Sequence, residues 1–152
     1  MKRRSFLQAT LSVAAGAALL RPADSRALAD TADAFAARSE ADVLRTLFGD
    51  ASLVPGKHVR IEAPVQSMQD KATPVKVFCD LEDVTMIVIL TRENRFPLNT
   101  YIRLFSAAGY YSTRIRLEKT SVVTACVQAG GDLYSASVRI KVTQGGYGMH
   151  ID

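Results

Sequence analysis

The sequence predicts an all-β fold, a single antiparallel β-sandwich. From residue 58 onward, apolar and polar residues alternate with a period of two. This alternation falls into seven short segments separated by turn residues, at the spacing typical of a sandwich. Only one stretch of the chain has the periodicity of a helix. We therefore expect about seven strands and one short N-terminal helix.

Residues 1–29 are predicted to be a twin-arginine signal peptide. The apolar run 11–20 is too short to span a bilayer, and residues 27–29 form a small-x-small cleavage site, so the mature chain is expected to begin at Asp30. The twin-arginine pattern is formed by Arg3, Arg4, Phe6 and Leu7. An ordinary secretory signal containing two arginines is the alternative. Both predict export, and we expect a periplasmic location.

Signal removal changes the charge of the protein. It takes away five of the 19 basic residues and one of the 15 acidic residues, which leaves 14 of each. A neutral domain has no general attraction to phosphate backbones or to anionic lipid. Nucleic acid and, after signal cleavage, the membrane are therefore not expected as partners.

The predicted helix lies within a lead-in segment, residues 30–57. Ser39 and Asp42 resemble a capping box at its start, and Gly49 ends it after Phe48. Its narrow apolar stripe, from Val43 to Phe48, must pack against another element.

The sandwich is expected to occupy residues 58–143. Residues 84–91 are almost entirely apolar, which predicts a central strand, and Gly130 and Gly131 predict a hairpin before the last strand. An immunoglobulin-like arrangement is the simplest that fits. The expected strands are 58–62, 75–81, 84–91, 100–105, 110–117, 121–129 and 133–143. The predicted core residues are Val77, Ile87, Val123, Ala136, Val138 and Ile140.

The sequence contains no set of residues typical of an enzyme. Its two histidines, His58 and His150, are far apart and lack metal-ligand spacing. Met149 and His150 could contact copper, but two ligands alone hold a metal weakly. We expect a non-enzymatic protein without a metal or cofactor.

The two cysteines, Cys79 and Cys126, fall in the second and sixth expected strands. Side-chain parity places Cys79 on the inward face and Cys126 on the outward face. We therefore expect unlinked thiols, with Cys126 accessible and faster to react with a bulky reagent. A disulfide across the core, made possible by a β-bulge, is the alternative.

Residues 144–152 are predicted to be a flexible arm. Gly145, Gly146 and Gly148 free its backbone around Tyr147. An arm of this kind can carry its tip into the cleft of another protein, and a frayed terminus is the alternative.

Several segments resemble the SoxY family of sulfur-oxidation proteins. They are 39–49, 94–98, 111–116, 133–137 and 141–143, together with the signal. The resemblance implies a periplasmic immunoglobulin-like sandwich that pairs with SoxZ, and a Gly-Gly-Cys-Gly-Gly arm whose cysteine carries sulfur intermediates between enzymes of thiosulfate oxidation.

This chain departs from the family at the arm, where Tyr147 stands in the position of the carrier cysteine and Met149 in that of the last glycine. A phenol cannot form the sulfur linkages of a thiolate. The leading hypothesis is a heterodimer subunit that has lost covalent carriage. Two alternatives are a sulfur carrier that uses Cys126 and an adaptor for another periplasmic oxidoreductase. The mixed faces of 100–105, with Ile102 and Leu104 on one of them, suggest a partner interface.

Overall fold

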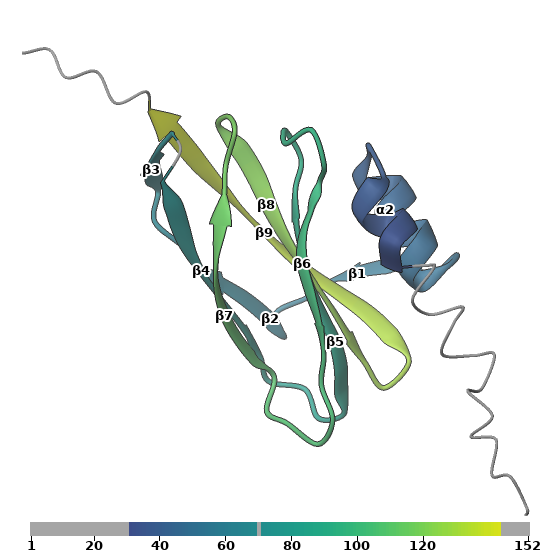
Figure 1. The fold of residues 1–152 in the computed structure, drawn as a ribbon. Coiled ribbons are helices and arrows are strands. Elements are labelled where there is room, and N and C mark those ends of the chain that lie inside the picture. Colours follow the sequence, from purple (N-terminus) through teal and green to yellow (C-terminus); the bar gives the residue numbers. More distant parts are fainter. Residues whose placement is uncertain (1–30, 70, 144–152) are drawn as a thin grey trace, which may run out of the picture.

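The computed structural model describes residues 31–69 and 71–143 (Figure 1). The predicted signal peptide and the arm with Gly145, Gly146, Tyr147 and Gly148 lie outside these residues. The elements are α2 (Glu40–Phe48), β1 (Leu53–Pro55), β2 (Val59–Glu62), β3 (Gln66–Met68), β4 (Ala72–Cys79), β5 (Val84–Thr91), β6 (Leu98–Arg103), β7 (Tyr110–Arg116), β8 (Ser121–Ala129) and β9 (Asp132–Thr143).

The strands form two sheets that face each other. The larger sheet has the order β1-β9-β8-β5-β6, with β3 also paired to β9, and the smaller sheet has the order β2-β4-β7. In Figure 1, β4 and β7 lie on one side, α2 lies on the other, and β5 and β8 lie between them. No helix in the described part of the chain is long and apolar enough to cross a membrane. The predicted all-β sandwich is confirmed.

All seven expected strands are present, and two short ones are added. β1 and β3 pair with β9 in parallel, so the larger sheet is not purely antiparallel. β4 begins at Ala72 rather than at residue 75, and Pro74 lies inside it. Pro74 is tolerated because β2 pairs β4 only from Lys76 to Cys79, so that β4 has a single partner strand beside the proline.

The predicted helix forms with the predicted ends. The hydroxyl oxygen of Ser39 accepts a hydrogen bond from the backbone N–H of Asp42 at 3.1 Å, and Gly49 ends the helix with φ 65°. Residues 31–36 are also helical, which the sequence did not predict. Six residues make fewer than two turns, too few to show a helical period.

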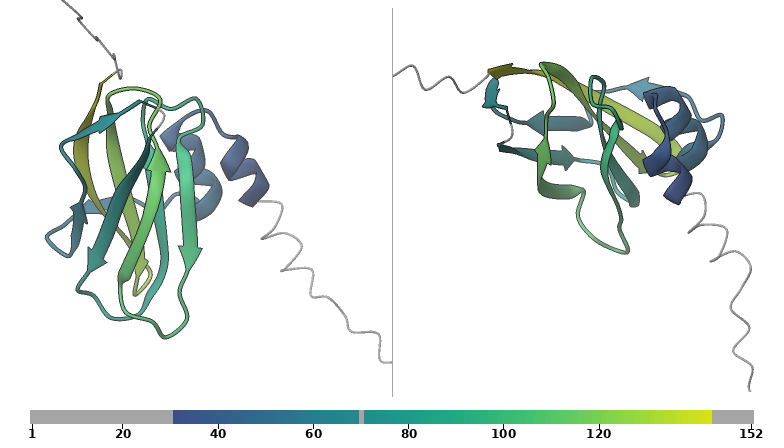
Figure 2. Two further views of the ribbon diagram at one scale, coloured as in Figure 1. Left: turned by 60° about the vertical axis from the view of Figure 1, so that its left-hand side comes forward. Right: turned by 45° about the horizontal axis from the view of Figure 1, so that its top comes forward.

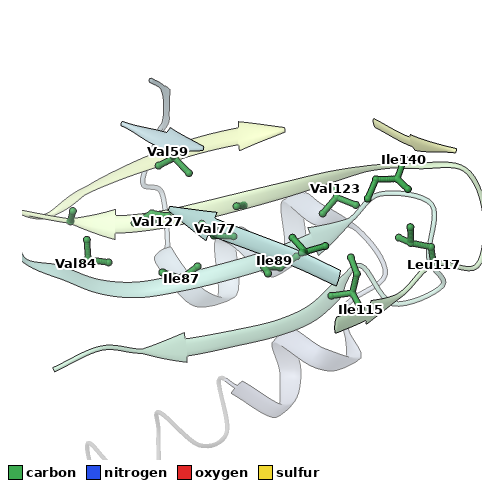
Figure 3. Packing of buried hydrophobic residues seen from close by; sticks show 13 residues of the cluster. Val59, Val77, Val84, Ile87, Ile89, Ile115, Leu117, Val123, Val127 and Ile140 are labelled. Carbon is green, nitrogen blue, oxygen red and sulfur yellow. The ribbon is translucent and has the colours of Figure 1, made fainter. Parts of the chain in front are cut away.

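The main core lies between the two sheets. Figure 3 shows Val77 and Ile115 of the smaller sheet facing Ile87 and Ile89 of the larger one, with Ile140 nearby. Of the predicted core residues, Val77, Ile87, Val123 and Ile140 are fully buried. Ala136 and Val138 pack against this core but are only partly buried. A three-stranded sheet does not extend over every strand of the wider one, so the middle of β9 is incompletely covered.

A second core lies on the outer face of the larger sheet, beneath the helices. Val43 of α2 and Ala34 of the preceding helix are buried there against Val88 and Leu90 of β5. Both views in Figure 2 show the helices outside the sandwich. The apolar stripe of α2 therefore packs against the sheet, as its pattern requires.

The apolar side chains of β6 pack largely within the chain, and the partner interface suggested for residues 100–105 stays a prediction. Ile102 and Leu104 pack against the main core, and Tyr101 packs against the second core. Both faces of the strand are used within the chain because the helices cover its outer side. Phe105, beyond the strand, remains 86% exposed.

Candidate functional site

The chemistry that the described residues offer is centred on Cys79, at the end of β4. Its backbone N–H donates a hydrogen bond to the carbonyl of Gly109 at 2.6 Å. A Cβ on Gly109 would lie 2.6 Å from the carbonyl oxygen of Cys79, so the loop approaches Cys79 this closely only because residue 109 is glycine. The approach fixes the end of β4 against the β6–β7 loop.

Cys79, which is partly buried, is one of the residues that line an open pocket of about 220 Å³. Strand pairing forms this pocket, because Val59 of β2 lies opposite Cys79 and brings the residues before it alongside. The other lining residues are Lys57, His58, Arg60, Phe78 and Asp80. We refer to these six residues as the Cys79 pocket.

Two polar side chains of the pocket are held in place by contacts. Nδ1 of His58 is 2.9 Å from a carboxylate oxygen of Asp80, and the His58 ring meets the Tyr134 ring edge-on, with centroids 5.8 Å apart. The guanidinium carbon of Arg60 lies 4.4 Å from the centroid of the Phe78 ring. Cys79, His58 and two residues with cationic side chains, Lys57 and Arg60, therefore lie around one opening.

The Cys79 thiol is not activated in this arrangement. Burial raises its pKa above the ordinary value, the neighbouring Asp80 charge raises it further, and a hydrogen bond with the Leu81 backbone lowers it only in part. The thiolate, which is the nucleophilic form, is correspondingly scarce at neutral pH. Reaction at Cys79 depends on alkaline pH or on a partner that changes its surroundings.

Cys126 is inaccessible, contrary to the expectation from the sequence. It does lie on the outward face of β8, as parity predicted, but the helices cover that face and its exposed fraction is 0%. Burial, with a smaller contribution from the charge of Glu40, raises the pKa of this thiol to about 12. Alternation along a strand shows which face a residue occupies, and it does not show whether a helix covers that face.

The two cysteines are both free, as predicted. Cys79 packs at the margin of the main core, and Cys126 belongs to the second core across the larger sheet. Within residues 31–69 and 71–143, no group of three histidine, cysteine or acidic side chains could hold a metal ion. His150 and Met149 lie outside the described residues.

The Cys79 pocket has no signature in the sequence, because its members come from two segments about twenty residues apart. The one available signal was strand pairing, since adjacent antiparallel strands bring His58 and Cys79 near the same end of a sheet. Turn lengths alone did not fix that register.

We expect Cys79, not Cys126, to react first with a bulky thiol reagent in the folded protein. The labelling rate of Cys79 should keep increasing up to a higher pH than that of an ordinary exposed thiol. The reason is that its pKa is raised, so its thiolate forms only at higher pH. Peptide mapping after timed labelling at several pH values measures this. Cys79→Ser should abolish labelling under native conditions, and early label on Cys126 would contradict the structure.

Comparison with known proteins shows which family this chain resembles. A family model described as "Sulfur oxidation protein SoxY" matches residues 44–146. The sulfur carrier protein SoxY from Chlorobium limicola f thiosulfatophilum, a solved structure, is 30% identical, with a TM-score of 0.63, and the match covers 68% of this chain and 94% of that one. No curated protein matched the sequence.

A second group of solved structures shares the fold alone. A superoxide reductase (neelaredoxin) from Ignicoccus hospitalis matches with 19% identity and a TM-score of 0.51, over 56% of this chain and 80% of that one. Its variant E23A matches with 16% identity and a TM-score of 0.52. At this identity the likeness concerns the sandwich architecture.

Proposed function

Because the chain belongs to the SoxY family, we propose that it is a non-enzymatic subunit of periplasmic thiosulfate oxidation that pairs with a SoxZ-type sandwich and lacks covalent sulfur carriage on its arm. Membership of the SoxY family, whose members act in sulfur oxidation, supports the proposed role in thiosulfate oxidation. The twin-arginine pattern at Arg3 and Arg4 supports the compartment.

The observation that carries the loss of carriage is Tyr147. The family resemblance assigns this position to the carrier cysteine, and both cysteines of the chain, Cys79 and Cys126, lie on the sandwich instead. A tyrosine hydroxyl has a pKa of about 10 and forms neither a persulfide nor a thiosulfonate. The arm of this protein therefore has no group on which to load sulfur.

A tyrosine between glycines can still serve recognition. In the sequence, Tyr147 stands between Gly146 and Gly148, and tyrosine is among the residues most enriched at the centres of interfaces. We propose that Tyr147 occupies the cleft that receives the carrier cysteine in other members of the family. The protein would then compete with a sulfur carrier for binding to the enzymes of thiosulfate oxidation, or it would bind the SoxZ-type subunit.

A second candidate, covalent carriage on the sandwich, now rests on Cys79 rather than on Cys126. Cys126 is fully buried, whereas Cys79 lines an open pocket beside Lys57 and Arg60. Basic side chains favour the anionic end of a sulfur oxyanion adduct. The raised pKa of Cys79 counts against this candidate, because it lowers the thiolate fraction.

The test is to mix the mature protein with its SoxZ-type partner and the thiosulfate-oxidising enzymes, and then to measure intact mass. We expect a 1:1 complex by size-exclusion chromatography and no added sulfur mass. A sulfur adduct that maps to Cys79 would replace the leading proposal with the second candidate. Failure to form the complex would instead favour an adaptor for another oxidoreductase.

A further inference from the structure

The outer face of the smaller sheet is uncovered by the described part of the chain. Successive residues of its strands point alternately into the core and outward, so the outward set comprises the exposed positions of β2, β4 and β7 together with the partly buried Phe78. In Figure 1 this sheet lies on the side of the sandwich away from α2. Its outward residues are Arg60, Glu62, Ala72, Pro74, Lys76, Phe78, Tyr110, Ser112, Arg114 and Arg116.

The strand register arranges these residues in rows. Phe78 lies between Arg60 and Tyr110, and Lys76 lies between Glu62 and Ser112. In the next two rows, Pro74 pairs with Arg114 and Ala72 pairs with Arg116. The face therefore has an aromatic end, near the Cys79 pocket, and a basic end.

The face carries an uncompensated positive charge. It holds four basic side chains and one acidic side chain, in a mature chain with equal numbers of each. Glu62 pairs with Arg60, whereas Lys76, Arg114 and Arg116 form no ion pair with any acidic residue among those described. Like charges in adjacent rows of a sheet repel one another. An opposing negative surface would relieve that repulsion.

The aromatic end supplies an anchor for a protein partner. The rings of Phe78 and Tyr110 lie 5.0 Å apart between centroids, Arg60 lies over Phe78, and Tyr110 is 47% exposed. Aromatic and arginine side chains are enriched at the centres of protein interfaces. Proteins that bind DNA through its backbone typically make roughly six to ten phosphate contacts. Among the described residues, the face has only three unpaired cations, which favours a protein partner over a nucleic acid.

We propose that the outer face of β2, β4 and β7 docks an acidic surface of the SoxZ-type partner. This rests on the pairing proposed above and names the surface that performs it. Complementary charge steers the encounter with Lys76, Arg114 and Arg116, and the adjoining rings of Phe78 and Tyr110 supply an apolar contact at the other end of the face. It differs from the interface that the sequence suggested on residues 100–105, whose Ile102 and Leu104 pack against the core.

The experiment compares charge reversals on two faces by calorimetric titration of the purified mature protein with a purified SoxZ-type protein. Lys76→Glu and Arg114→Glu should each weaken binding at least ~10-fold, and binding by the wild type should weaken as salt is raised. Lys76→Arg, which keeps the charge, should bind normally. Arg139→Glu, an exposed position on β9, is the matched control and should change affinity less than ~2-fold.

The outcomes separate this inference from the proposed function. If the wild type binds and both reversals bind equally well, or if Arg139→Glu weakens binding as much as they do, the surface is wrong and the pairing stands. If the wild type does not bind, both fail. A duplex DNA oligonucleotide and phosphatidylglycerol vesicles should not bind, and their binding through Lys76 and Arg114 would overturn the proposal in favour of a polyanion. Thermal unfolding should match among all variants, because the substituted side chains are exposed.

Discussion

Replacing Ile140 with alanine is expected to lower the free energy of unfolding by about 2 to 5 kcal/mol. Ile140 is fully buried in the main core and lies opposite Ser121 of β8. The substitution removes apolar contacts and leaves a cavity that two hydrogen-bonded sheets cannot close by small shifts. Urea unfolding of the mature protein, followed by circular dichroism, measures the loss.

Val138→Ala on the same strand is the control. Its side chain packs against the same core but is only partly buried, and opposite it lies Val123. Water already reaches part of this side chain, so its removal should lower stability by about 1 kcal/mol or less. Equal losses at positions 138 and 140 would contradict the incomplete cover of β9 by the smaller sheet.

The main strands could be predicted from the sequence because apolar and polar residues alternate along a strand that buries one face. β8 begins and ends where the alternation and the glycines placed it, and Gly130 and Gly131 have positive φ values in the hairpin. β1 and β3 could not be predicted in this way. Three residues contain no measurable period, and their pairing with β9 is set by where the chain crosses between the sheets.

The candidate site was less predictable than the fold, because it depends on what covers each surface. Parity placed Cys79 and Cys126 on opposite faces, and the structure agrees. The prediction that Cys126 is accessible was wrong, because nothing in the sequence of β8 shows that the helices pack over that face. The close approach of Gly109 to Cys79 also joins segments that no local pattern connects.

Tyr147→Cys is expected to convert the protein from one that gains no sulfur mass into one that carries an adduct on most of its molecules. The substitution restores a thiol at the position that the family resemblance assigns to the carrier, on an arm that keeps Gly145, Gly146 and Gly148. A thiol at this position can form the persulfide or thiosulfonate linkage that the tyrosine hydroxyl cannot. Cys79, by contrast, has a raised pKa, which lowers its thiolate fraction at neutral pH.

The measurement is intact mass after incubation with the SoxZ-type partner, the thiosulfate-oxidising enzymes and thiosulfate. A background of Cys79→Ser and Cys126→Ala leaves the introduced thiol as the single possible site of an adduct, and Tyr147→Ser in that background should gain no mass. Adding Met149→Gly restores the last glycine of the family's arm. If the protein still binds its partner and gains no mass even with both arm substitutions, then Tyr147 is not what prevents carriage, and the reason must lie on the sandwich surface that meets the loading enzyme.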